Sequence, residues 1–386
     1  MLEIGKKESA AASKVIESGN IFRYGANGAC AEFEKRYAEF TGAKYVSLTA
    51  SGTTALTVAM QALGIGPGDE VLVPAHTYMA TATAVVATGA IPVIVDIDES
   101  IMISPKAIEK AIRKRTKAVI PVHMWGHVCD MKSIMKIARK HKLLVIEDAC
   151  QCVGGFYEGK AAGTIGDAGC FSFNFFKNMT CGEGGAVIVK KKEHHERLAN
   201  LIDCCGFFWE GRKSIEAFCA GSTRKSDIEG AILTAQLDRL PGLIKKSRAN
   251  KKRIIKATAK CGLKQIPLHS LDHECSQMLM FQLETEEQAI KFQTAVSGIR
   301  LIQTGRHTFT EWDPILNKIG HIHPLMDPFK MKANEKCRMN YSKDILPKSV
   351  DILSRTVAVG TGPKMTADDV KKLIAKIKEA AKSIYS

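Results

Sequence analysis

The strongest candidate for chemistry in this sequence is a lysine that follows an unusually apolar run. The run FSFNFF (171–176) leads directly into Lys177, and GEGG (182–185) follows shortly after. An ammonium group behind so many aromatic rings is poorly solvated, which makes it a usable nucleophile toward a carbonyl compound. The glycines allow the backbone to turn closely beside it. A single lysine in so basic a chain would ordinarily be a solvent-exposed surface residue. The apolar run and the glycines around Lys177 are what distinguish it.

An acidic residue, Asp148, closes a second apolar run, LLVIED (143–148). A carboxylate just past a buried strand is partly desolvated and needs a partner. A protonated pyridine nitrogen would keep it ionised, whereas the alternative is a capping role for the next turn. Both interpretations of Asp148 stay open on residue type alone.

A third group, Ser51-Gly52-Thr53, follows the run YVSLT and opens a helical pattern that continues to Leu63. The free backbone N–H groups and the positive dipole end of such a helix start form a phosphate site. The plainer alternative is Ser51 as a helix N-cap with Gly52 in a tight turn.

The elements that must position these residues are short β-branched runs alternating with amphipathic stretches. Strands are expected at 45–48, 70–74, 92–96, 118–122, 143–147, 169–173 and 186–189. Alternation of this kind predicts an α/β fold with a mostly parallel sheet covered on both faces. Ligands of such sheets bind at the carboxyl ends of the strands, where all three groups fall.

The pattern changes after Pro241-Gly242, where a basic helical stretch leads into weaker alternation. QMLMFQLE (277–284) is the clearest strand there, and a helix capped by Thr366, with Asp369 at its third position, ends the chain. We predict a large domain at 1–242 and a smaller α+β domain at 243–386.

Composition limits the function classes. The 386 residues carry a net charge of +15, but the basic residues are spread along helices without a nucleic-acid motif, so we expect no nucleic-acid partner. Neither a targeting signal nor a membrane-length apolar stretch is visible, which predicts a soluble, cytoplasmic protein without a membrane partner. The twelve cysteines are expected to be reduced, and neither their spacing nor the His321-x-His323 pair favours a metal site.

Taken together in chain order, these motifs resemble the DegT/StrS family of sugar aminotransferases. The matching segments are ASGT (50–53), GIGPGDEVLVP (64–74), EDACQ (147–151), GTIGD (163–167) and FSFNFFKNMTCGEGG (171–185). The resemblance implies the type I, aspartate-aminotransferase-like fold, pyridoxal 5′-phosphate as cofactor, and a homodimer with active sites at the subunit interface.

The resemblance also implies individual roles. Lys177 matches the lysine that holds the cofactor as a Schiff base and moves the proton. Asp148 matches the acid at the pyridine nitrogen, and Gln151 the residue beside the 3-hydroxyl. Tyr78 falls where the family places an aromatic residue that stacks on the ring. The phosphate cradle corresponds to Ser51, Gly52, Thr53 and Ser172.

Two positions refine this picture. Family members that act as dehydratases carry histidine where Lys177 stands, which favours transamination here. The family's Gly-x-Asn-x-Arg motif, whose asparagine reaches the neighbouring subunit's phosphate, aligns with Gly221-Ser222-Thr223-Arg224. Ser222 replaces the asparagine with a shorter side chain that has fewer donors.

The expected reaction moves an amino group from glutamate or glutamine to a keto sugar in amino-sugar or surface-polysaccharide biosynthesis. The finer resemblance, at residues 22–24, 122–126 and 353–356, is to members that act on an 8-oxo-octulosonate, although a nucleotide-linked sugar stays open. Arg23, His123 and His307 are then candidate substrate contacts, with structural hydrogen bonds as the alternative. The rival functions are a pyridoxal-phosphate dehydratase and a catalytically inactive binding or regulatory protein on the same fold.

Overall fold

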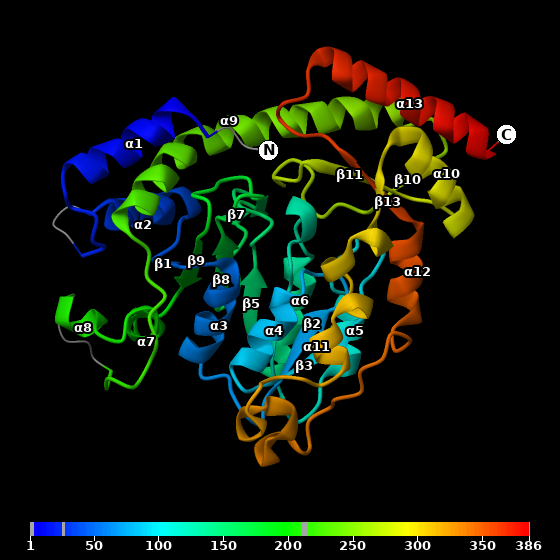
Figure 1. Cartoon of the computed structure of the whole chain (residues 1–386). Coiled ribbons are helices and arrows are strands. Elements are labelled where there is room, and N and C mark those ends of the chain that lie inside the picture. The colour runs from blue at the N-terminus through cyan, green and yellow to red at the C-terminus, as the bar shows by residue number, and fades with distance from the viewer. Residues whose placement is uncertain (1–3, 25–27, 210–214, 386) are drawn as a thin grey trace.

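The computed structural model describes residues 4–24, 28–209 and 215–385. Its centre is a seven-stranded sheet, shown in Figure 1. In spatial order the strands are β1 (Tyr45–Thr49), β9 (Gly185–Val189), β8 (Ala168–Ser172), β5 (Leu144–Asp148), β4 (Thr116–Val119), β2 (Glu70–Pro74) and β3 (Ile91–Val95). Strand β9 runs antiparallel to both of its neighbours, and the pairs from β8 to β3 are parallel.

The central strands are buried on both faces. Every residue of β2, β3, β8 and β9 is buried, so consecutive side chains pointing to opposite faces are all covered. This is why each strand reads as a continuous apolar run rather than as an alternation. Six of the seven predicted strands agree with the observed ones within one residue at each end. The strand predicted at 118–122 lies earlier, at Thr116–Val119.

Helices connect and cover these strands. They are α1 (Lys6–Glu17), α2 (Ala29–Thr41), α3 (Gly52–Ala62), α4 (Ala80–Ala87), α5 (Pro105–Ala111), α6 (Met131–His141), α7 (Lys192–Ile202) and α8 (Gly206–Trp209). Helix α3 packs on β8 and β9, and α4 packs on β2 and β3. A short hairpin, β6 (Phe156–Tyr157) with β7 (Lys160–Ala161), follows β5.

A second, antiparallel sheet follows in the sequence. Leu279 and Phe281 on one of its faces belong to a separate, smaller hydrophobic core, and Met280 and Ala358 belong to the large core. Its spatial order is β10 (Lys264–Gln265), β11 (Met278–Gln282), β13 (Thr356–Gly360) and β12 (Ile299–Arg300). The helices of this part are α10 (Glu286–Val296), α11 (Asp313–Leu316), α12 (Pro347–Arg355) and α13 (Ala367–Tyr385). The predicted cap of α13 is present, because Thr366 and Asp369 exchange hydrogen bonds.

One long helix, α9 (Asp227–Thr258), is common to both cores. It runs along one side of the molecule from α1 and α2 to α13 (Figure 1). Leu240 and Ile244 belong to the large core, and Ile254 belongs to the small one. The helix continues through Pro241 and Gly242, so the domain boundary predicted at 242 falls inside a helix rather than in a linker.

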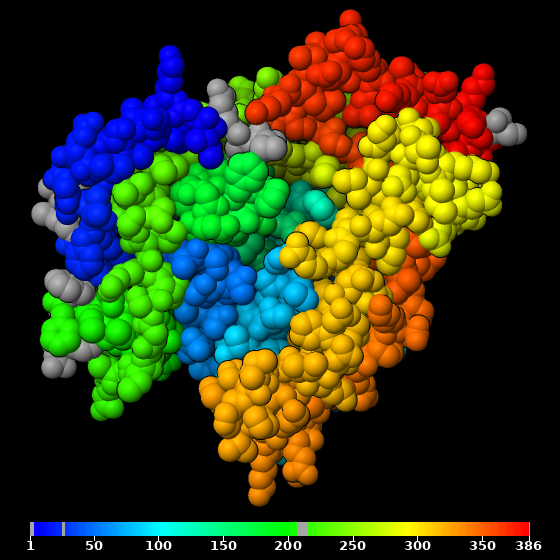
Figure 2. Space-filling model, viewed as in Figure 1, coloured from blue at the N-terminus to red at the C-terminus, as the bar shows by residue number. Residues whose placement is uncertain are grey.

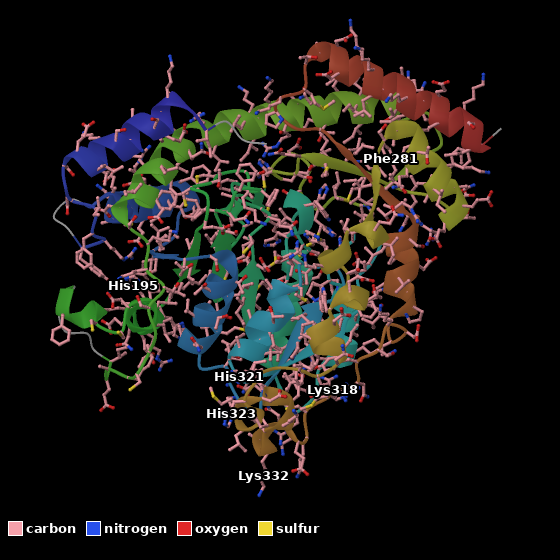
Figure 3. The ribbon with its side chains drawn as sticks, viewed as in Figure 1. His195, Phe281, Lys318, His321, His323 and Lys332 are labelled. Atoms are coloured by element: carbon pink, nitrogen blue, oxygen red, sulfur yellow. The ribbon has the colours of Figure 1, made fainter. Side chains whose placement is uncertain are left out.

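Residues 318–335 form a lobe that projects at the lower edge of the space-filling view (Figure 2). Short 3-10 turns build it, and Ile322 and Leu325 on it are 96% and 83% exposed. Figure 3 labels His321, His323 and Lys332 on this lobe. The two histidines cap turns locally, since His321 Nδ1 accepts the backbone N–H of His323 and His323 Nδ1 accepts that of Leu325.

The twelve cysteines are all free thiols. None of the helices in the described ranges has the length and apolarity needed to cross a bilayer.

Candidate active site

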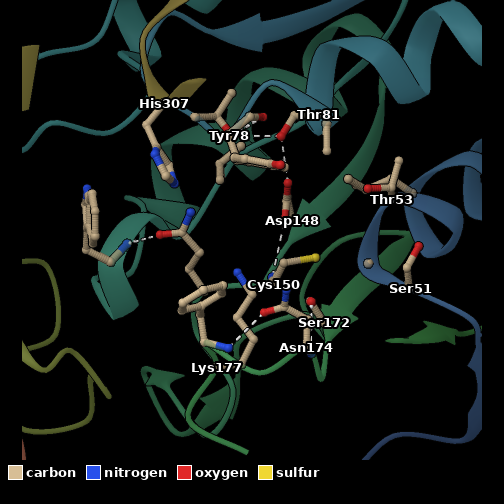
Figure 4. Close-up of a pocket in the computed structure, with 18 of the residues that line it drawn as sticks. Ser51, Thr53, Tyr78, Thr81, Asp148, Cys150, Ser172, Asn174, Lys177 and His307 are labelled. Carbon is tan, nitrogen blue, oxygen red and sulfur yellow. Dashed lines mark hydrogen bonds between the residues drawn. The ribbon is translucent and has the colours of Figure 1, made fainter. Parts of the chain in front are cut away.

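A cavity of roughly 690 Å³ lies at the carboxyl ends of the parallel strands, and Arg306 and His307 form part of its wall. Figure 4 shows this pocket. Nine of the predicted site residues line it: Ser51, Gly52, Thr53, Tyr78, Asp148, Gln151, Ser172, Lys177 and His307. Arg23, His123 and Ser222 are not among the residues that line it.

Two adjacent acids at the end of β5 have different environments because strand side chains alternate between faces. Glu147 is fully buried and accepts hydrogen bonds from the backbone N–H groups of Gly163, Ile165 and Gly166. Its neighbour Asp148 points into the pocket. Glu147 therefore stabilises the loop before β8, and Asp148 is available to a ligand.

The Asp148 carboxylate is held in one orientation. The Thr81 hydroxyl donates to its Oδ2 at 2.8 Å, and the Cys150 backbone N–H donates to its Oδ1 at 3.1 Å. Thr81 is in turn 2.7 Å from the Thr77 hydroxyl. All these partners are neutral, so the carboxylate, which is only 5% exposed, has no cation paired with it in the described chain. A bound cation, such as a protonated ring nitrogen, fits this position.

Helix α3 begins at the opposite side of the pocket from His307 (Figure 4). Ser51 caps it by accepting the Thr54 backbone N–H at 3.1 Å. The backbone N–H groups of Gly52 and Thr53 have no hydrogen-bond partner within the described residues. A helix start with free N–H groups binds anions such as phosphate. Ser51 is thus the N-cap of α3, which was the alternative interpretation of this residue. The cap leaves the neighbouring N–H groups available to a phosphate.

Glycine is required at position 52. A Cβ atom there would lie 2.7 Å from Ser172 Cβ and 2.8 Å from Cys150 Sγ. The close approach brings the start of α3 against the ends of β8 and β5. The free N–H groups and the Ser172 hydroxyl consequently face one small space that matches a phosphate group.

Lys177 stands in a turn that follows β8. Its backbone N–H donates to the Asn174 carbonyl at 3.0 Å, and the next residue, Asn178, donates to the carbonyls of Val153 and Cys275. The Lys177 ammonium has no hydrogen bond or ion pair within the described part of the chain, although it lines the pocket. A half-buried primary amine that faces the cavity is the group that a carbonyl ligand would meet.

Three rings form the remaining wall. His307 lies 5.4 Å from the Tyr78 ring and 5.2 Å from the Trp125 ring, between centroids. Trp125 has a left-handed backbone conformation (φ 56°), and its N–H donates to Gln151 Oε1 at 3.0 Å. Its indole N–H donates to His76, whose pKa burial lowers to about 3, so that this ring stays neutral and can accept. Trp125 is a pocket residue that the sequence analysis missed.

His307 faces the pocket as a neutral ring. Burial lowers its pKa, and the nearby charges of Lys177 and Arg306 lower it further. Its Nδ1 lies 3.1 Å from the Thr304 carbonyl, which can only accept, so Nδ1 carries the proton. The free Nε2 is then an acceptor for a ligand hydroxyl.

The prediction that His123 and Arg23 contact substrate is not supported by their positions. His123 is fully buried, with Nε2 3.0 Å from Glu147 and Nδ1 accepting the Cys129 backbone N–H. Arg23 is paired with Glu34 at 2.7 Å and is 9% exposed. Both side chains are used in structural hydrogen bonds, as their alternative interpretation proposed.

Ser222 lies outside the pocket of its own chain and is exposed. Near it, Asp203, Cys204 and Cys205 bring three possible metal ligands within 4.8 Å of one another. The Asp203 carboxylate is already occupied, because it accepts from Arg224 at 2.7 Å and from the Cys205 backbone N–H at 3.0 Å. This cluster therefore gives no reason to add a metal to the site.

The unpaired amine, the oriented carboxylate and the anion cradle at the end of a mostly parallel sheet are the features of a type I pyridoxal-phosphate enzyme, and the residues present fit that cofactor. The chain matches the DegT/DnrJ/EryC1/StrS aminotransferase family over residues 2–378 and belongs to that family. It is a pyridoxal-phosphate-dependent transaminase.

Relatives agree with this assignment. GDP-perosamine synthase of Caulobacter vibrioides is 42% identical over 214 residues, which is 54% of this chain and 56% of that protein. The dTDP-3-amino-3,6-dideoxy-alpha-D-galactopyranose transaminase of Aneurinibacillus thermoaerophilus is 32% identical over 371 residues, 96% of this chain and 94% of that one. The aminotransferase structure from Psychrobacter cryohalolentis has a TM-score of 0.81 at 26% identity, covering 100% of this chain and 98% of that one.

Proposed function

We propose that this enzyme moves an amino group from glutamate or glutamine to a keto sugar, with Lys177 and Asp148 as its catalytic residues. One observation supports the proposal most strongly. The pocket contains the Lys177 ammonium, which has no partner in the described chain, the Asp148 carboxylate, whose hydrogen-bond partners are neutral, and the N-terminus of α3 with its free N–H groups. The three groups supply an amine, an anion and a phosphate site at one edge of the sheet.

The roles of the residues follow from their chemistry. When bound, pyridoxal phosphate acts as an electron sink that stabilises a carbanion next to the transferred nitrogen. Lys177 would hold the cofactor, and its amine would carry the proton to and from the substrate carbon. Asp148, oriented by Thr81 and Cys150, keeps the ring nitrogen protonated. Gln151, fixed by its bond to Trp125, is left with its amide N–H groups for the ring hydroxyl.

A sugar substrate is supported by the polar groups at the far end of the pocket and by the relatives. Neutral His307 offers an acceptor there, and Gln277, which donates to Asn178, also lines the pocket. Two relatives are named for amino sugars carried on a nucleoside diphosphate. We favour a keto sugar, either nucleotide-linked or an 8-oxo-octulosonate.

The substrate is tested with the amino-loaded enzyme. Holoenzyme treated with glutamate and then freed of it should convert one member of a keto-sugar panel to its amino sugar, detected by mass. The panel contains nucleotide-linked keto sugars, an 8-oxo-octulosonate and 2-oxo acids. Amination of the 2-oxo acids alone would contradict a sugar substrate, and loss of water from a sugar without gain of nitrogen would indicate a dehydratase.

We also propose a homodimer whose subunits complete each other's sites. Phe176, next to Lys177 and lining the pocket, is 83% exposed in the single chain. Large apolar side chains at a pocket rim are expected to be covered by a partner surface. A second copy of this chain is the partner we propose, with Ser222 reaching the neighbour's cofactor phosphate.

Mixing two inactive variants tests this arrangement. Ser222→Glu should weaken cofactor binding in the neighbouring subunit, because it places a carboxylate against the phosphate. Heterodimers of Ser222→Glu with Lys177→Ala then contain one site with both native residues, and activity should exceed the sum of the separate variants. Glu158→Gln, on the exposed turn between β6 and β7, serves as a control in place of Ser222→Glu. A sedimentation mass of one chain, or no gain on mixing, would contradict the shared site.

A further inference from the structure

The segment 304–309 belongs to the second half of the chain but is attached to the end of β2. The Arg306 carbonyl accepts the Met79 backbone N–H at 2.8 Å and the Trp312 indole N–H at 3.1 Å. The Phe309 N–H donates to the Ala75 carbonyl at 3.0 Å. The backbone that carries Arg306 is therefore fixed on both sides.

The side chain of Arg306 is directed to the pocket without an anionic partner. Its guanidinium lies over the Tyr78 ring, 5.5 Å from the centroid, and lines the cavity. No carboxylate or carbonyl accepts from it within the described residues. Elsewhere arginines hold carboxylates, as Arg338 does with Glu70 and Arg355 with Asp351.

The position of Arg306 excludes the cofactor phosphate as its ligand. Its neighbour His307 lies across Asp148 from Ser51 in Figure 4, so the anion cradle at the start of α3 is at the other end of the pocket. Among the charged lining residues, Lys177 and Asp148 are assigned to the cofactor. Glu183 stands in the loop beyond Lys177 and is not paired with Arg306.

We propose that Arg306 is a specificity-determining residue that binds a substrate carboxylate. A guanidinium supported on an aromatic face presents a planar pair of N–H donors, which matches a carboxylate in a two-point contact. Neutral His307 beside it adds an acceptor for a hydroxyl and no competing positive charge. This inference rests on the proposed function, since the carboxylate belongs either to the amino donor or to an acidic keto sugar.

The experiment compares Arg306→Gln, Arg306→Lys and the control Lys332→Gln, which removes an exposed charge on the projecting lobe. Binding of glutarate, an unreactive dicarboxylate analogue of the donor, is measured by calorimetry on the holoenzyme. If the carboxylate is that of the amino donor, loss of this charge-assisted contact should raise the dissociation constant of glutarate about tenfold or more in Arg306→Gln. Arg306→Lys should retain part of the affinity, and Lys332→Gln should match the native protein.

A second arm uses the amino-loaded enzyme with an acidic keto sugar and with the neutral keto sugar of the same skeleton. Weaker glutarate binding by Arg306→Gln would show that Arg306 binds the carboxylate of the amino donor. A higher half-saturating concentration of the acidic sugar, with no change for the neutral sugar, would show that it binds the carboxylate of the acceptor. Unchanged values in both arms, or only a lower maximal rate, would overturn the inference. If no keto sugar is aminated, the proposed substrate class fails, while glutarate binding still tests Arg306.

Discussion

Lys177→Ala should abolish transamination, lowering the rate by about 10³-fold or more. In the proposed mechanism this one side chain supplies both the amine that holds the cofactor and the group that moves the proton. The ammonium has no partner within the described residues, so its removal breaks no contact that stabilises the fold. The variant should keep its melting temperature without cofactor and lose covalent attachment, measured by borohydride trapping and mass analysis.

The matched control is Lys160→Ala, which removes an exposed lysine on β7. It should leave attachment and rate unchanged. Cofactor attachment and turnover equal to those of the native protein in Lys177→Ala would contradict the catalytic role of Lys177. No turnover by the native holoenzyme would favour the rival interpretation of a binding protein on a catalytically inactive fold.

Asp148→Asn should lower the rate roughly 10²–10³-fold, as expected for the loss of a preorganised charge at the reacting group. The substitution is nearly isosteric, and the Thr77–Thr81 hydroxyl pair can reverse its direction to accept from the new amide N–H. The carboxylate charge is thus removed while the hydrogen bonds around it remain. The absorption spectrum of bound cofactor should shift toward the form with an unprotonated ring nitrogen.

Asp344→Asn, at an exposed position outside the pocket, is the control for this variant. Equal melting temperatures for the two proteins without cofactor would separate chemistry from folding. A native rate for Asp148→Asn would show that ring-nitrogen protonation does not depend on this carboxylate.

The sheet was predictable because its strands are covered on both faces. The resulting apolar runs are short and rich in β-branched residues, which favours buried strands over a buried helix segment. The antiparallel direction of β9 was not predictable, because a short apolar run gives no information about whether a strand is parallel or antiparallel to its neighbours. The continuity of α9 was also missed: Pro241 lacks an N–H and ordinarily ends a helix, but burial of Leu240 and Ile244 on either side keeps this one intact.

The site was predictable where spacing fixed the geometry. Asp148 ends β5, and Gly52 and Lys177 come shortly after β1 and β8, so the sheet brings them to one edge. The prediction that His123 contacts substrate failed because its side chain points into the core, toward Glu147. The chain turns after β4, and Trp125 lines the pocket instead. Arg306 could not be found from sequence, because its place depends on bonds between residues 75–79 and 306–309.

The long helix shared by the two cores has a mechanical consequence. Rotation of one sheet against the other would bend α9 at a point packed by side chains of the large core. Access for substrate should therefore arise from side-chain movements at the rim of the pocket rather than from rotation of one sheet against the other. Crystals grown with and without a bound amino sugar should superpose over both sheets, with changes confined to the rim around Arg306.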